Sequence, residues 1–62
     1  MTLITQRNLA DPDRIYARIL AAHEGKSENA SAAFDARLIL ILANHIGSET
    51  ILAEAIRLAE GD

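Results

Sequence analysis

The segment "LILILANHIG", residues 38–47, decides the fold of this chain of 62 residues. Six apolar residues follow one another, and Asn44, His45, Ile46 and Gly47 close the segment. The flanking "AAFDAR" and "ANH" contain no turn signal, so the pattern predicts a helix, although a short run rich in Ile is also compatible with a strand. A chain this short buries only about 60% of the surface that it exposes when unfolded. The sequence therefore predicts a helix whose apolar surface exceeds what the chain itself can cover.

Capping residues define three helical segments. Ser27 precedes the apolar helix as its N-cap, and Gly47 ends that helix at the position where a left-handed glycine is favoured. Ser48 can cap the next helix at once, and Asp11 followed by Pro12 starts the first one. Apolar stripes joined by short linkers are typical of a small all-α unit. We expect one domain over residues 1–62, with a tail at 1–9 and three helices at about 11–24, 27–46 and 48–60.

The charge and composition exclude several classes of function. Nine acidic against six basic residues give a net charge of −3, and the basic residues form no block that would attract a nucleic acid. The sequence has no cysteine and no signal-peptide pattern, and its apolar runs are far shorter than the ~18 residues of a membrane span. We expect a soluble, cytoplasmic protein that binds neither nucleic acid nor membranes.

The stretch "LANHIGSETILAEAI" is similar to the centre of a helix-turn-helix, with Ala43, Gly47 and a following helix. A recognition helix needs basic and amide side chains to reach phosphates and base edges. The helix here would present Glu49, Thr50 and Glu54, and its carboxylates repel DNA. A DNA-linked regulator, such as an antitoxin-like protein, therefore ranks last among the possible functions.

The apolar helix presents hydrophobic side chains over well over half of its circumference. A helical wheel leaves only a narrow polar arc, formed by Arg37, Asn44 and His45. The other two helices, each about three turns long, can cover only part of the rest, and an uncovered apolar surface normally marks a protein–protein contact. We therefore expect a homodimer, with a tight monomeric bundle that exposes some Ile and Leu as the alternative. The candidate interface residues are Leu38, Ile39, Leu42 and Ile46.

Three polar residues are predicted to have structural roles. Asp11 is the N-cap of the first helix. His45 lies near the end of the apolar helix, where the helix dipole favours a cation, and antiparallel packing brings Asp11 and Asp13 toward it. We expect a structural hydrogen bond or ion pair there, with a metal ligand or proton carrier as the alternative. Asn44 is expected at the edge of the core, and the alternative is a buried position that fixes register.

No constellation of residues points to catalysis or to a cofactor. His23 is the other histidine, and it lies at the opposite end of the apolar helix from His45, so the two can meet only across an antiparallel dimer. Asp35 and Arg37 are expected to be surface or interface partners. We find no metal-site spacing, no phosphate-binding loop and no nucleophile with an adjacent base. The sequence therefore predicts a protein that is not an enzyme and has no cofactor or metal.

Three blocks of the sequence carry a family resemblance: "NLADPD" at residues 8–13, "AHEG" at 22–25 and "ARLILILANHIG" at 36–47. They resemble a family of very short bacterial proteins classed as a domain of unknown function, and the resemblance extends from Asn8 to Ala59. Because that family has no assigned activity, the resemblance implies none. Members of the family are often encoded near flavin-dependent aromatic hydroxylases, which implies a small accessory protein of an aromatic-degradation system.

These observations predict a non-catalytic helical protein that acts by association. It would form a homodimer or serve a larger protein as a small accessory subunit. The alternative is a small-molecule or metal-binding module at a dimer interface, to which His23, His45 and the aspartates would contribute.

Overall fold

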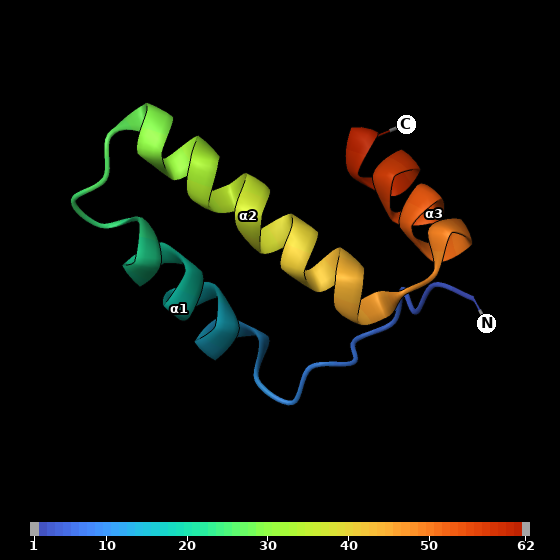
Figure 1. Cartoon of the computed structure of the whole chain (residues 1–62). Coiled ribbons are helices and arrows are strands. Elements are labelled where there is room, and N and C mark those ends of the chain that lie inside the picture. Colours follow the sequence, from blue (N-terminus) through green and yellow to red (C-terminus); the bar gives the residue numbers. More distant parts are fainter. Residues whose placement is uncertain (1, 62) are drawn as a thin grey trace.

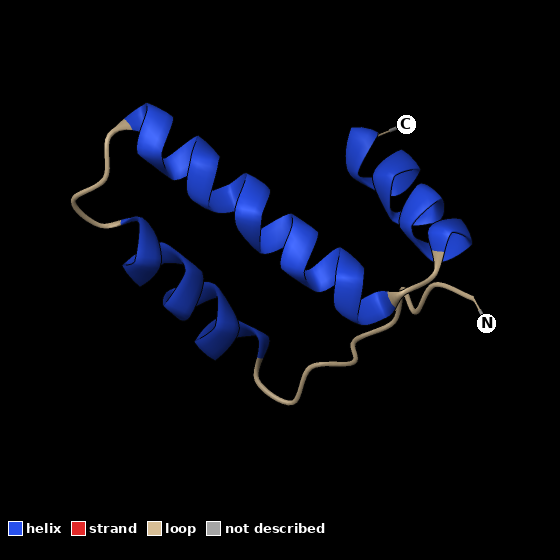
Figure 2. Cartoon of the chain, in the orientation of Figure 1, coloured by secondary structure: helices blue, strands red, loops and turns tan. Residues whose placement is uncertain are grey.

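Three helices make up most of the chain in the computed structural model, which describes residues 2–61 (Figure 1, Figure 2). They are α1 (Pro12–His23), α2 (Glu28–Ile46) and α3 (Glu49–Glu60). No strand occurs in this part of the chain, so the predicted all-α fold of three helices is confirmed. Met1, which belongs to the predicted tail, lies outside the described residues.

Side-chain caps set the first residue of each helix. Asp11 accepts a hydrogen bond from the backbone amide of Arg14, with 3.1 Å between oxygen and nitrogen. Ser27 and Ser48 each accept one from the amide three residues further on, at 3.2 Å. Each cap satisfies an amide that has no partner within its own helix. The predicted ranges include the N-cap residue of each helix. Each helix in the structure therefore begins one residue after the first residue of its predicted range.

The turn between α2 and α3 depends on Gly47. Its φ of 68° is left-handed, a conformation that glycine adopts without strain. The Gly47 amide donates to the carbonyl of Ala43 at 2.9 Å, which closes the last turn of α2. Because Ser48 then caps α3 directly, α3 starts immediately and turns back beside the end of α2 (Figure 1).

The helices are spread out rather than closed around one core. In Figure 1, α2 lies in the middle, with α1 on one side of it and α3 on the other. The Cα radius of gyration is 13.3 Å. A compact domain of this length would have a radius of about 10.6 Å.

The hydrophobic core of the single chain is very small. Ile51 is the only buried hydrophobic side chain between residues 2 and 61, with 6% of its surface exposed. Thirteen other large hydrophobic side chains are exposed, among them Tyr16 of α1. The solvent-accessible surface is 5621 Å². A compact folded monomer of this mass would have about 3,900 Å². The three helices of the single chain therefore do not close into a tight bundle in this structure.

Candidate interaction surface

An apolar groove of about 460 Å³ is lined by residues of α2 and α3. The two helices diverge from their shared turn (Figure 1). The contribution of α2 is Ile39, Leu40 and Ala43. The contribution of α3 is Leu52, Ala55, Ile56 and Ala59. We call this surface the α2–α3 groove. All of its side chains are aliphatic, so nothing in its lining can form a hydrogen bond or an ion pair through a side chain.

The α2–α3 groove has both raised and recessed positions. Ile39, Leu40 and Ile56 stand out from the surface, with exposed fractions of 64%, 69% and 63%. Ala43 and Ala55 are half-buried. Large side chains thus project beside recessed small ones, which is the relief that lets two helical surfaces interlock.

The chemistry of the α2–α3 groove suits an apolar protein surface better than a small molecule. Small-molecule sites combine apolar walls with a few polar groups that orient the ligand. The groove has no such side chains. Elsewhere in residues 2–61, no group of three or more His, Asp or Glu side chains could hold a metal ion. None of the helices in that range is both long and apolar enough to cross a membrane.

The opposite flank of α3 has a different character. A second hollow, of about 390 Å³, lies between α3 and the N-terminal tail, where Leu3 is half-buried. Glu54 and Arg57 belong to its lining. Two of the charged side chains of α3 are therefore on this flank, and no charged side chain is in the lining of the α2–α3 groove.

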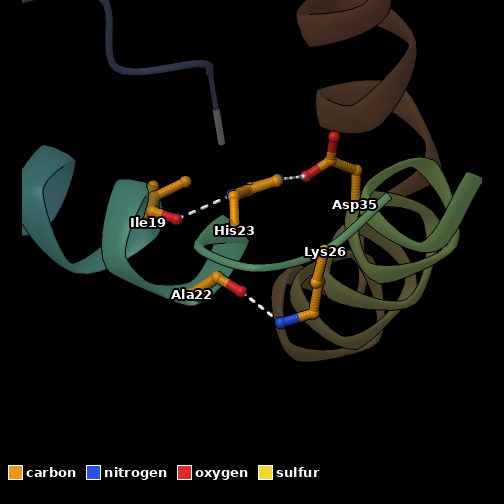
Figure 3. A network of polar contacts seen from close by, with 5 residues as sticks. All are labelled: Ile19, Ala22, His23, Lys26 and Asp35. Atoms are coloured by element: carbon orange, nitrogen blue, oxygen red, sulfur yellow. Dashed lines mark hydrogen bonds and ion pairs between the residues drawn. The ribbon is translucent and has the colours of Figure 1, made fainter. Parts of the chain in front are cut away.

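A polar cluster at His23 joins the end of α1 to α2 (Figure 3). The Nδ1 atom of His23 lies 2.7 Å from the carbonyl oxygen of Ile19, and its Nε2 atom lies 2.7 Å from a carboxylate oxygen of Asp35. The imidazole also meets the ring of Phe34 edge-on, with 5.0 Å between centroids. Lys26, in the linker, donates to the carbonyl of Ala22, and its ammonium lies 5.2 Å from the centroid of the Phe34 ring.

The His23 cluster favours the charged imidazolium. Both ring nitrogens face acceptors, and only the doubly protonated ring can donate to both. The carbonyl of Ile19, followed by the carboxylate of Asp35, raises the pKa of His23 above its usual 6.5. Desolvation and the positive charge of Lys26 oppose this effect. Among the described residues, His23 and Asp35 form the only ion pair and the only hydrogen bond between side chains of α1 and α2.

The family of the chain follows from comparison with known proteins. The model of a family described as "Protein of unknown function (DUF2783)" matches residues 3–61. The chain belongs to the DUF2783 family. The resemblance to a domain of unknown function is thus confirmed over nearly the whole sequence. No curated protein and no solved structure gave a significant match.

The structure divides the predicted interface residues of this DUF2783 chain between different surroundings. Ile39 is in the lining of the α2–α3 groove. Leu38 is half-buried and lies at helical spacing from Phe34, on the side of α2 that meets α1. Leu42 and Ile46 are 51% and 42% exposed and lie outside the groove lining. The sequence did not single out Leu40 or the residues of α3, although the apolar stripe of α3 is itself a signal.

The predicted polar residues of the DUF2783 chain also differ in their roles. Asp11 caps α1 through the amide of Arg14. His45 and Asn44 are exposed, and no side-chain hydrogen bond or ion pair of either occurs among residues 2–61. The structural bond expected for His45 is thus not seen among the described residues, where its side chain is exposed.

The sequence predicts a hydrogen bond or ion pair between His45 and Asp11 or Asp13. The structure instead has a histidine–aspartate ion pair between His23 and Asp35. The sequence predicts Asp35 as a surface or interface residue. It predicts a contact between His23 and His45 only across a dimer. The available signal was the position of His23 in the last turn of α1, beside a short linker that returns α2 toward it. The pairing with Asp35, twelve positions along the chain, depends on the angle between α1 and α2.

Proposed function

We propose that this DUF2783 chain is a non-catalytic helical protein that acts by association through the apolar surfaces of α2 and α3. The partner is either a second copy or a larger protein that the chain serves as a small accessory subunit. The observation that carries the proposal is the ratio of core to exposed apolar residues. Within residues 2–61 one hydrophobic side chain is buried, and thirteen large ones are exposed.

The amount of exposed surface fits this proposal. The accessible surface of 5621 Å² exceeds the value for a compact monomer by about 1,700 Å². Interfaces in permanent complexes bury about 2,000–5,000 Å² in total, counted over both partners. A partner that covered this excess, with a similar area of its own, would form an interface of that class. Exposed apolar patches of such extent usually mark a protein contact.

The proposal extends to the setting implied by the family resemblance. There the chain would be a cytoplasmic accessory subunit in a bacterial system that degrades aromatic compounds. Its small size and apolar surface fit a subunit that is stable only when bound, because a chain of this length has little core of its own.

Sedimentation velocity tests the proposal directly. The chain of 6.7 kDa is run alone and mixed with a flavin-dependent aromatic hydroxylase from the same organism. The expected result is either a species heavier than one chain when the chain is run alone, or co-sedimentation of the chain with the hydroxylase in the mixture. A cooperatively folded monomer in both samples, with no shift of the hydroxylase, would contradict the proposal.

The other candidate function is a small-molecule or metal-binding module at a dimer interface. One observation favours it: Nε2 of His23 and Oδ1 of Asp35 lie 2.7 Å apart, so both could bind one metal ion if Nε2 gave up its proton, and a partner would then add the remaining ligands. Titration with zinc or iron followed by native mass spectrometry separates the two functions, because association alone predicts no bound metal.

A further inference from the structure

We infer that the α2–α3 groove binds the same groove of a second copy of this chain, so that two α2–α3 hairpins form a four-helix core. The inference rests on the proposed function and names its partner. It commits to a dimer related by a two-fold axis, in which Ile39 and Ile56 of each copy enter the groove of the other.

The exposed area is sufficient for such a dimer. Part of the excess of about 1,700 Å² belongs to the extended residues 2–10. The whole excess is about twice the ~800 Å² that a standard stable interface buries on each partner. Each chain therefore exposes enough surface for such a dimer, with the seven aliphatic residues of the groove at the centre of the contact.

The chemistry of the groove allows two copies to face each other in spite of their equal charge. Each chain has a net charge of −3, which by itself disfavours association. None of this charge is in the groove lining, and the charged residues Glu54 and Arg57 belong to the other flank of α3. Two facing grooves would bury no unpaired charge and no polar side chain, so the desolvation cost of such groups is absent.

The relief of the groove is self-complementary. In a two-fold dimer the same patch meets itself, so every raised position needs a recessed position within that patch. The exposed Ile39, Leu40 and Ile56 are the raised positions, and the half-buried Ala43, Leu52 and Ala55 are the recessed ones. Alanines at recessed positions also let helices approach closely. A partner surface without raised side chains opposite these alanines would leave gaps in the interface.

The approach to the groove is open. No residue of α1 is in the groove lining. In Figure 1, α1 lies across α2 from α3. A second copy can therefore reach the groove without displacing α1 or the His23 cluster, and α1 would remain on the outside of the four-helix core.

Two isoleucines of α2 provide a matched pair for the test. Ile39 and Ile41 are both 64% exposed, and they differ in that only Ile39 is in the groove lining. Sedimentation equilibrium would compare the wild type with Ile39→Glu and Ile41→Glu, and circular dichroism would record helix content. We expect a wild-type dimer at micromolar concentration. Ile39→Glu should raise its dissociation constant at least about a hundredfold, because it buries an unpaired charge, and Ile41→Glu should change it little.

The outcomes separate the inference from the proposed function. If the dimer persists in Ile39→Glu, or if Ile41→Glu weakens it equally, the groove is not the dimer interface. The proposed function of association would still hold. A wild-type chain that is monomeric alone and binds only a larger protein overturns the second copy as partner. A folded monomer with no partner at all overturns both.

A second measurement covers the case in which Ile39→Glu does not fold. Isotope-labelled and unlabelled wild-type chains are mixed, and isotope-filtered NOE spectra are recorded to select contacts between chains. The inference predicts NOEs between the methyl groups of Ile39 and Ile56 and the methyl groups of Ala43 and Ala55 in the other copy. Contacts between chains that are confined to α1, or to Ile41, would overturn it.

Discussion

Replacing Ile51, the one buried hydrophobic residue within residues 2–61, tests how much this small core contributes to stability. Ile51 is 6% exposed, and Ile→Ala substitutions at buried positions usually cost about 2–5 kcal/mol. We expect a value near 2–3 kcal/mol for Ile51→Ala, because no other hydrophobic side chain within residues 2–61 is buried and half-buried neighbours such as Leu52 and Ala55 can close part of the cavity. A chain of this length has a total stability of only about 3–9 kcal/mol. The loss is therefore a large fraction of what holds the fold together.

Thermal denaturation followed by circular dichroism measures this effect. For a domain of this size, about 2–3 kcal/mol lowers the thermal midpoint by roughly 10–20 °C. The matched control is Ile41→Ala, because Ile41 is 64% exposed and alanine is a better helix former. The control should change stability by no more than about 0.5 kcal/mol. If Ile51→Ala and Ile41→Ala had equal midpoints, the claim that burial of Ile51 stabilises the fold would be refuted.

Four further predictions follow from individual contacts. Asp11→Ala should weaken α1 by about 0.5–2 kcal/mol, because the Arg14 amide loses its acceptor; faster amide hydrogen exchange in α1 and a lower thermal midpoint would show it. Gly47→Ala should cost about 1–2 kcal/mol, because alanine is strained at the left-handed φ of 68°. The added Cβ would lie 3.8 Å from the Asn44 carbonyl oxygen, an ordinary contact that adds no further cost. An unchanged midpoint in urea unfolding would contradict this prediction. The raised pKa of His23 stabilises the fold fully below a pH of about 6.5, and this contribution is lost as pH rises through the raised value. The thermal midpoint of the wild type should accordingly fall from pH 6 toward pH 9 as His23 loses its proton. His23→Gln should remove this contribution of His23 to the pH dependence of the midpoint. The control His45→Asn should retain it. Elemental analysis of the purified wild type should find no bound metal; stoichiometric zinc or iron that disappears in His45→Asn would support the alternative function.

The caps and the fold class could be predicted from the sequence because they depend on local chemistry. Ser27, Ser48 and Asp11 each accept a hydrogen bond from an amide three residues away, so their role depends on short-range geometry alone. Gly47 likewise ends α2 through a bond that spans only four residues. Such signals are present in the sequence whatever the tertiary packing, which is why the three helices could be predicted.

The surfaces of α2 could be predicted only in part, since they depend on where its neighbours lie. A helical wheel assigned Leu38 and Ile39 to one apolar arc, but Leu38 lies on the side toward α1 and Ile39 lies in the α2–α3 groove. The angle at which α3 leaves Gly47 decides this division, and a wheel does not contain that angle. The same holds for His23 and Asp35, whose contact depends on the placement of α1 against α2.

The central claim is that this chain reaches its full stability only in association, and the concentration dependence of the wild type tests it most directly. The thermal midpoint and the sedimenting mass would be measured on the same samples over about a hundredfold range around micromolar concentration. The account predicts a mass of two chains at the upper end and a midpoint that rises with concentration, because a partner that binds only the folded state stabilises it by mass action. A single-chain mass throughout, with a sharp and constant midpoint, would contradict the account and would mean that one chain with one buried hydrophobic side chain is stable by itself.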